Sequence, residues 1–165
     1  MKPAPILHIY TDGASRGNPG KAAFAYVIEP VEGESIEEAG CLGTMTNNQA
    51  EYTALVRSLE HALELGPQHR VFVQSDSELL VKQMNGEYRV KNDDLRDLFD
   101  QAQDLRRRFK GGVTIRHVRR AANSRADALC NEALDGKRLP SVRDLMRPKS
   151  APAPKPPPGI STLQK

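Results

Sequence analysis

Four short segments of the chain each place a carboxylate beside small or amide-bearing residues. They are Tyr10-Thr11-Asp12-Gly13, Asn47-Asn48-Gln49-Ala50-Glu51, Gln74-Ser75-Asp76-Ser77 and Asn123-Ser124-Arg125-Ala126-Asp127. Carboxylates that share one site raise each other's pKa values unless a cation neutralises them. A pair of divalent ions would do so, and hard oxygen ligands suit Mg²⁺ better than zinc. The four segments together predict a metal-dependent nuclease.

The elements that position these carboxylates can be read from apolar spacing. Apolar, β-rich runs predict strands over residues 6–11, 24–29, 35–43, 71–75 and 113–118, with a loop over 14–20 joining the first two. Helical spacing predicts helices over 47–66, 77–85, 93–109 and 123–135. This order predicts an α/β sandwich with a mixed sheet, antiparallel at first and then continued by strands reached through helices.

Two carboxylates follow predicted strands and two lie on predicted helices. Asp12 and Asp76 come at the carboxyl ends of strands, where α/β sheets open a ligand crevice. Glu51 and Asp127 fall on the inward faces of their helices. Each acid alone also has a local explanation as a turn or helix-capping residue. Independent caps have no reason to converge, so the combination favours a shared site.

Charge is distributed unevenly along the 165 residues. Up to Gly136 the chain has 17 Lys/Arg and 20 Asp/Glu, whereas residues 137–165 have seven basic residues, one acidic residue and seven of the twelve prolines. We therefore expect one domain over residues 1–136 and a basic, proline-rich, disordered tail over 137–165. The tail is either without consequence or a non-specific contact for nucleic acid.

The composition also bears on the compartment. Only Cys41 and Cys130 are present, which argues against a disulfide framework. No run of eighteen apolar residues exists, and the first residues lack the pattern of a secretory signal. We expect a cytoplasmic protein that is a monomer and does not contact membranes.

The motifs resemble those of type 1 ribonuclease H. The resemblance rests on residues 10–20, 46–51, 75–77 and 123–129, in the right order and with compatible spacings over about residues 6–134. It implies the ribonuclease H-like three-layer fold, with a five-stranded mixed sheet, three strands antiparallel and then parallel, flanked by helices. It also implies an endoribonuclease that cuts the RNA strand of RNA/DNA hybrids with two Mg²⁺ ions, accepts Mn²⁺, and leaves 5′-phosphate and 3′-hydroxyl ends.

Carried over residue by residue, the resemblance assigns roles to the four carboxylates. Asp12 would bridge both metal ions, and Asp127 would complete the site of the ion that activates water. Glu51 and Asp76 would hold the ion beside the departing 3′ oxygen. Two ions roughly 3.5 to 4 Å apart can clamp both ends of an in-line displacement.

The same resemblance assigns substrate contacts. The 2′-hydroxyl distinguishes RNA from DNA. In the family it is contacted by the loop backbone and by amide side chains near the glutamate, which here correspond to Gly17, Asn18, Asn47, Asn48 and Gln49. Thr46 and Asn92 match positions that grip a phosphate of the DNA strand.

The chain departs from many bacterial members in two places. It lacks the histidine-bearing loop before the last helix, where only residues 119–122 stand, and residues 86–91 are too few for the basic protrusion of some relatives. We therefore expect the compact branch of the family, with Arg119 or Arg120 taking over phosphate contact or product release. Activity on double-stranded RNA or at RNA–DNA junctions is open.

Three other functions were compared with this one. A DNA nuclease or strand-transferase of the same superfold would need no reader of the 2′-hydroxyl, which Asn47 and Asn18 supply. A binding module without activity would be expected to have lost at least one of the four carboxylates. A nucleotide-binding protein is excluded, because Gly20-Lys21 is followed by Ala22 and no dinucleotide-binding glycine motif follows a strand.

Overall fold

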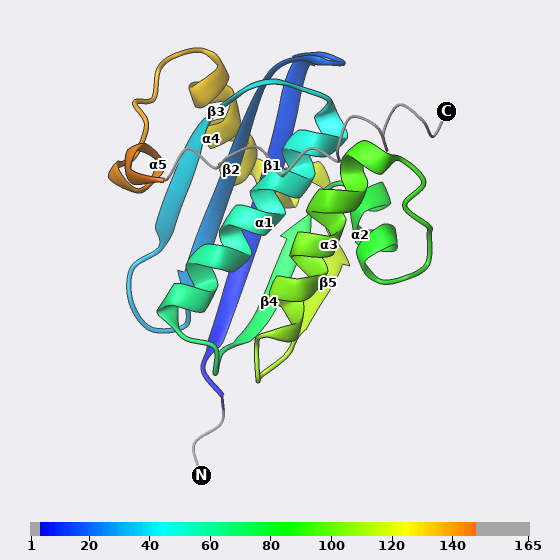
Figure 1. Ribbon diagram of the computed structural model, residues 1–165. Coiled ribbons are helices and arrows are strands. Elements are labelled where there is room, and N and C mark those ends of the chain that lie inside the picture. Colours follow the sequence, from blue (N-terminus) through cyan, green and yellow to red (C-terminus); the bar gives the residue numbers. More distant parts are fainter. Residues whose placement is uncertain (1–3, 148–165) are drawn as a thin grey trace.

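A computed structural model describes residues 4–147 and contains one five-stranded sheet (Figure 1). The order of the strands in the sheet is β3-β2-β1-β4-β5. Their bounds are β1 Ile6–Gly17, β2 Gly20–Pro30, β3 Ile36–Met45, β4 Arg70–Ser75 and β5 Val113–His117. The first three strands pair antiparallel, whereas β4 and β5 are parallel to β1. The predicted mixed sheet is therefore confirmed.

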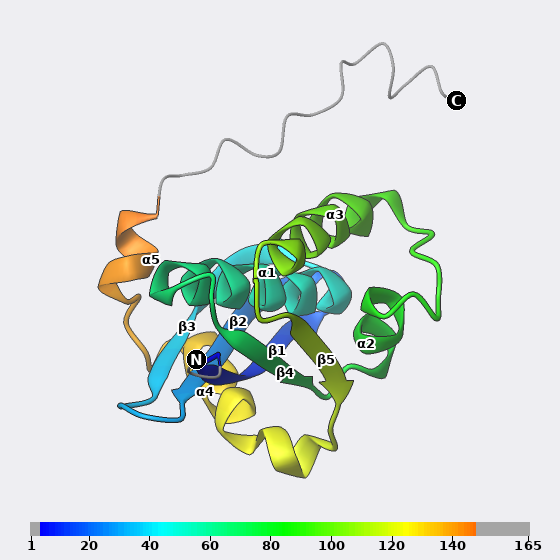
Figure 2. The same ribbon diagram turned by 90° about the horizontal axis from the view of Figure 1, so that it is seen from below.

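Helices cover both faces of the sheet (Figure 2). Their bounds are α1 Asn47–Leu65, α2 Glu78–Met84, α3 Asp93–Arg107, the short 3₁₀ helix η1 Arg120–Asn123, α4 Ser124–Leu134 and α5 Val142–Met146. Helices α1 and α3 lie on one face, and α4 lies on the other. The chain thus forms the predicted three layers.

The side chains of β2 alternate between the two faces of the sheet and contribute to a separate core on each face. Phe24, Tyr26 and Ile28 pack in the cluster that contains the apolar residues of α1. Ala23, Ala25 and Val27 pack in a second cluster with α4. Because successive side chains of a strand point to opposite faces, one strand supplies both cores. The two alanines leave room for α4 to approach the sheet closely.

Strand β1 is longer than its sequence predicts. It continues beyond Asp12 to Gly17 and pairs with β2 as far as Gly20, so the predicted loop 14–20 shrinks to a tight turn at Asn18-Pro19. Residues 13–17 are small or polar and have weak strand propensity by themselves. The apolar partner strand β2 decides their conformation. Asp12 therefore lies within β1 and not at its end.

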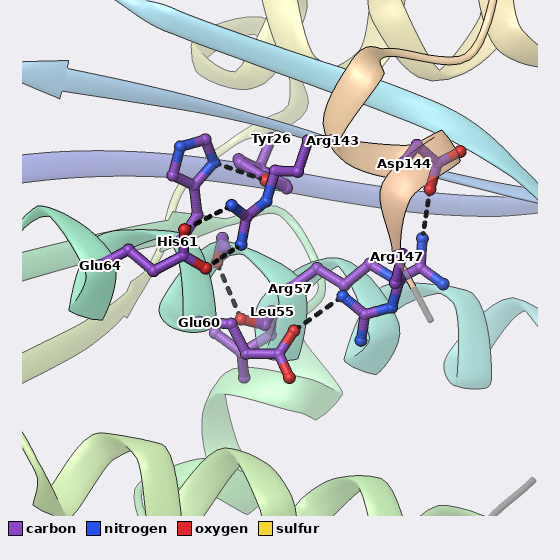
Figure 3. A network of polar contacts seen from close by, with 10 residues as sticks. Tyr26, Leu55, Arg57, Glu60, His61, Glu64, Arg143, Asp144 and Arg147 are labelled. Carbon is purple, nitrogen blue, oxygen red and sulfur yellow. Dashed lines mark hydrogen bonds and ion pairs between the residues drawn. The ribbon is translucent and has the colours of Figure 1, made fainter. Parts of the chain in front are cut away.

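The structure also differs from the prediction after Gly136. Within the segment predicted as an extended tail, α5 packs beside β3 (Figure 1) and beside α1 (Figure 2). Three ion pairs join this segment to α1 (Figure 3): Arg143 with Glu64, Arg147 with Glu60, and Asp144 with Arg57. The Ser141 hydroxyl donates a further hydrogen bond to Glu38 of β3.

The spacing of these charges explains why α5 docks. Glu60 and Glu64 stand four residues apart on one face of α1, and Arg143 and Arg147 stand four apart in the α5 segment. Side chains four apart lie above one another on a helix, so two acids can meet two arginines at once. Arg138 also pairs with an acid, Glu132. Three of the seven basic residues after Gly136 are thus already paired, and residues 148–165 lie outside the described part of the chain.

Within residues 4–147, none of the helices has both the length and the apolar character that crossing a bilayer requires. The predicted compartment stays a prediction.

Candidate active site

Asp12, Glu51 and Asp76 meet at one place from three different elements. Each contributes a carboxylate oxygen, and these three oxygens lie within 4.8 Å of one another. The parallel pairing of β1 with β4 runs as far as Thr11 and Ser75. Asp12 is the next residue of β1, and Asp76 directly follows the end of β4, so the sheet itself holds them side by side.

Gly13 allows α1 to bring Glu51 into this group. A Cβ atom at Gly13 would lie 2.3 Å from the carbonyl carbon of Ala50 and 2.4 Å from the backbone nitrogen of Glu51. Cβ atoms do not come this close to atoms to which they are not bonded, so any side chain here would push α1 away from β1. The missing side chain therefore places the backbone of Glu51 directly against the strand that carries Asp12.

The fourth predicted carboxylate, Asp127, lies in the first turn of α4, outside the group of three. It is close enough to Asp12 for a hydrogen bond between the two carboxyl groups. The Arg120 guanidinium of η1 donates to Asp127 at 3.2 Å. Asn123, which is buried, donates from its amide to the backbone oxygen of Thr11 at 2.8 Å and so holds the start of α4 against β1.

Burial and mutual repulsion disfavour negative charge in this group. Burial, followed by repulsion from the three neighbouring carboxylates, raises the pKa of Asp12 from 3.8 to about 8. Burial is also the main cause that raises the pKa of Glu51 to about 7. Ionised carboxylates at this density require a cation, and Arg120 is the cation that the chain itself supplies at the edge of the group.

Three of the carboxylates line an open hollow of about 300 Å³, together with Gly13, Ala14, Asn47 and Arg120; the three are Asp12, Glu51 and Asp76. The donor set consists of hard carboxylate oxygens, close together and partly shielded from water. This is the ligand chemistry of Mg²⁺ and Mn²⁺. The residues therefore fit the divalent ions that the resemblance implies.

Asn47 connects the turn between β1 and β2 to the carboxylates. Its side-chain oxygen accepts a hydrogen bond from the Ser15 backbone at 3.3 Å, and its backbone N–H donates to the side chain of Asn18 at 3.1 Å. A hydrogen bond from its side chain favours the ionised form of Glu51. Gly17 ends β1 with a φ of 103°, a conformation that favours glycine. Asn47 and Glu51 thus line the hollow together, and Asn18 is connected to them through the backbone of Asn47.

The other predicted contacts have structural partners of their own. Thr46 caps α1, and its hydroxyl accepts from the backbone of Gln49, whose side chain accepts from the Thr46 backbone in return. Asn92 caps α3 by accepting from the backbone of Asp94. Asn48 is half-buried in the first turn of α1, and Arg119 is exposed just before η1.

Ser77 is a neighbour of the carboxylates to which the sequence assigns no role. It caps α2 by accepting from the Leu80 backbone at 3.2 Å, and its side chain also hydrogen-bonds Glu51. The only signal in the sequence is its place directly after Asp76. From the sequence, Ser77 is only a candidate helix-capping residue. Its contact with Glu51 arises because α1 lies beside the start of α2.

Known proteins resemble this chain over most of its described length. A family model described as "Reverse transcriptase-like" matches residues 10–133. Ribonuclease HI of Halobacterium salinarum is 45% identical over 130 residues, which are 78% of this chain and 64% of that relative. The match therefore spans slightly less than two thirds of the relative's length.

Solved structures agree with this likeness. The crystal structure of RNase H1 from the same archaeon matches with a TM-score of 0.74 and 44% identity, covering 79% of this chain and 98% of that one. LC11-RNase H1, isolated from compost, was crystallised in complex with an RNA/DNA hybrid, and it matches with a TM-score of 0.74 and 40% identity over 79% and 97% of the two chains. Because the family model covers residues 10–133 and the matched structures are covered almost from end to end, this chain belongs to the type 1 ribonuclease H family.

Proposed function

We propose that the protein is an endoribonuclease that hydrolyses the RNA strand of RNA/DNA hybrids and leaves 5′-phosphate and 3′-hydroxyl ends. The observation that carries this proposal is the meeting of Asp12, Glu51 and Asp76 within 4.8 Å, beside the amide of Asn47. The complex of the related LC11-RNase H1 with an RNA/DNA hybrid supports the choice of substrate.

The four carboxylates of Asp12, Glu51, Asp76 and Asp127 would hold two divalent ions. When bound, such ions supply a nucleophilic water at neutral pH and stabilise charge on the leaving oxygen. The chain's own part is to hold the acids close together, against the burial and repulsion that disfavour their charge. Gly13 does so by close packing, and the hydrogen bond of Ser77 stabilises the ionised form of Glu51.

Choice of the RNA strand would depend on the border of the hollow. The amide of Asn47 can both donate to and accept from a 2′-hydroxyl, and the backbone of the turn at Gly17 and Asn18 lies next to it. We propose that Asn48 and Gln49 also contact the RNA strand. Thr46 and Asn92, both helix caps, would offer their hydroxyl and amide groups to phosphates of the DNA strand.

Arg120 would assist turnover. It lines the hollow and contacts Asp127, so a phosphate leaving the site passes within reach of its guanidinium. We propose that Arg120, with Arg119 beside it, helps to release the product. Slower turnover is expected for the Arg119→Ala/Arg120→Ala variant, and unchanged turnover would remove this role.

The decisive assay incubates labelled RNA/DNA hybrid, RNA duplex, DNA duplex and an RNA–DNA junction with the protein and Mg²⁺ or Mn²⁺. We expect cleavage of the hybrid that EDTA abolishes. Asp12→Asn should lower the rate at least ~10³-fold, because loss of several kcal/mol of charge stabilisation has an effect of this size. A matched control is Asp100→Asn, which removes an exposed acid on α3 and should leave the rate unchanged.

The ends of the cleaved RNA and the activity on the other nucleic acids test the proposal further. RNA fragments should lose a 5′-phosphate to phosphatase and be extendable from their 3′-hydroxyl. Cleavage of DNA duplex in place of hybrid would show a DNA nuclease, and equal activity of Asp12→Asn and the unchanged protein would refute the proposed site.

A further inference from the structure

Residues 139–147, which we call the α5 arm, are held against the domain mainly by charged groups. Three ion pairs join the arm to α1 (Figure 3): Arg143 with Glu64 at 2.6 Å, Arg147 with Glu60 at 2.9 Å, and Asp144 with Arg57 at 3.0 Å. None of the five residues of α5 is buried. Docking therefore removes little apolar surface from water, and ion pairs supply most of its free energy.

Ion pairs of this kind hold the arm only weakly. Glu64 is 60% exposed and Glu60 is 32% exposed, so water and salt compete for both pairs. Five helical residues are also too few to form a stable helix once they leave the surface that supports them. The docked arm is therefore easily released, and release frees Arg143 and Arg147 together.

The two arginines have the chemistry of a phosphate contact. In the docked arm each faces a carboxylate, and Arg143 donates two hydrogen bonds to Glu64, at 2.7 and 2.6 Å. A guanidinium makes the same two-pronged contact with a phosphate group. Glu60 and Glu64 thus occupy the arginines in the way that a nucleic-acid backbone would.

The chain that leads into the arm leaves the domain beside the turn between β1 and β2. Asp135, at the end of α4, pairs with Arg16 of β1 at 2.5 Å. Two residues further along the chain, Asn18 accepts a hydrogen bond from the backbone of Asn47, which lines the hollow. Arg143 follows Asp135 by eight residues, and eight extended residues span up to about 27 Å. A released arm can therefore reach a nucleic acid that lies over the hollow.

We propose that docking of the α5 arm is an autoinhibitory contact for nucleic-acid binding. Glu60 and Glu64 mask Arg143 and Arg147 in the free protein, and a bound nucleic acid draws both arginines onto its phosphates. The apparent affinity is then lowered by the fraction of the protein whose arm is docked. This inference rests on the proposed function only in taking nucleic acid as the partner. Phosphate contacts carry no strand information, so DNA duplex and hybrid should release the arm alike.

Hydrogen exchange of the full-length protein in EDTA, which prevents cleavage, tests the release directly. The amides of Leu145 and Arg147 donate to Ser141 and Asp144 in the docked arm. A binding partner ordinarily slows exchange where it covers the protein, whereas release speeds exchange of amides whose hydrogen bonds are lost. We expect faster exchange over residues 142–147 when DNA duplex or hybrid is added to saturation. Unchanged or slower exchange there would show that the arm stays docked and would overturn the proposal.

The affinity for labelled DNA duplex, measured by fluorescence anisotropy in EDTA and about 50 mM salt, tests the masking. Glu60→Gln/Glu64→Gln should bind about 3- to 10-fold more tightly than the unchanged protein, the equivalent of losing two surface ion pairs in the free state. The matched control is Glu32→Gln/Glu34→Gln, which removes two exposed acids from the connection between β2 and β3. Its net charge changes equally, and its affinity should change less than about twofold, because screening weakens distant charges.

A second set of variants carries Arg143→Gln and Arg147→Gln in addition. In this background, removal of the two acids of α1 should affect affinity no more than the control pair does. Equal tightening in both acid variants, or the same tightening without the arginines, would assign the effect to net charge and overturn the masking. Urea unfolding shows that each variant is folded. Because these measurements use DNA duplex and need no cleavage, a protein that failed to cut hybrid would refute the proposed function and leave this test readable.

Discussion

The carboxylates at the two ends of α1 have opposite kinds of neighbours. Near its N-terminal end, Glu51 joins Asp12 and Asp76 within 4.8 Å, and none of these three makes an ion pair within the described residues. Toward its C-terminal end, Glu60 and Glu64 each receive an arginine from the α5 segment at 2.9 and 2.6 Å. One helix therefore carries a group of unneutralised acids and a group of fully paired acids.

The pKa values follow this difference. Burial and repulsion raise the pKa of Asp12 to about 8, and burial raises that of Glu51 to about 7. The hydrogen bond from Arg143 instead lowers the pKa of Glu64. The acids at the first end need a cation from outside the chain, whereas those at the second end serve to dock a segment of the chain. Glu51 and Glu64 are the same residue type on the same helix, and their different neighbours determine their different roles.

The largest expected effect is a loss of stability of the metal-free protein as pH rises. Asp12 has a pKa of 3.8 when unfolded and about 8 when folded, so its protonated form is the one that the fold accommodates. Stability is complete below pH 3.8, declines through the interval, and is lowest above pH 8. Half of the full conversion of this shift is about 3 kcal/mol, which allows for relaxation of the site. Urea unfolding in EDTA between pH 5 and 9 measures it.

Asp12→Asn and added Mg²⁺ are the controls for this titration. The variant cannot ionise at this position and should show a flatter pH profile, with higher stability than the unchanged protein at pH 9. Bound Mg²⁺ should flatten the profile of the unchanged protein and have little effect on the variant. A metal-free protein whose stability increases from pH 5 to 9 would contradict the repulsion between these carboxylates.

The active-site end of α1 could be predicted from sequence because local patterns determine it. Asp12 and Asp76 follow apolar strand runs, and Glu51 continues an apolar helical stripe, so each position follows from the spacing of its own segment. The parallel register of β1 and β4 then brings the two aspartates together. Ser77 was missed because its contact with Glu51 depends on how α1 passes α2, which no local pattern contains.

The docking of α5 on α1 could not be predicted, because it depends on residues far apart in the sequence. Prolines and basic residues after Gly136 indicate an extended segment, and five helical residues alone are too few to form a stable helix in water. What fixes α5 is the match between Arg143/Arg147 and Glu60/Glu64, whose members are more than 75 residues apart in sequence. The extension of β1 beyond Asp12 is similar, since pairing with β2 imposes it.

A smaller effect is expected from Gly40→Ala, which tests the docked end. A Cβ atom at Gly40 of β3 would lie 2.7 Å from a carboxylate oxygen of Asp144 and 3.0 Å from the ring of Phe24. The carboxylate of Asp144 must shift, which weakens its ion pair with Arg57. We expect destabilisation of about 1 to 2 kcal/mol, the cost of overpacking and of a strained partly buried pair. Urea unfolding at pH 7 measures it, with hybrid cleavage unchanged.

Asp144→Ala provides the second arm of a double-mutant cycle. If the new methyl group acts mainly on Asp144, Gly40→Ala should cost less in the Asp144→Ala background than in the unchanged protein. Additive effects of the two substitutions would instead place the conflict with Phe24, in the core, and would separate Gly40 from the docking of α5.

The smallest effect is expected from Glu64→Gln, and its sign and pH dependence are opposite to those of Asp12→Asn. Glu64 is 60% exposed, so its bidentate pair with Arg143 contributes about 0.5 to 1 kcal/mol. Its folded pKa is lowered below 4.5, so this contribution is complete above pH 4.5 and is lost as pH falls through the folded value. The variant should be less stable than the unchanged protein at pH 7 and equal to it at low pH, measured by urea unfolding. Asp12→Asn should instead be the more stable protein at high pH. If both substitutions shifted stability in the same direction at pH 9 without metal, the two ends of α1 would not differ in the way their neighbours indicate.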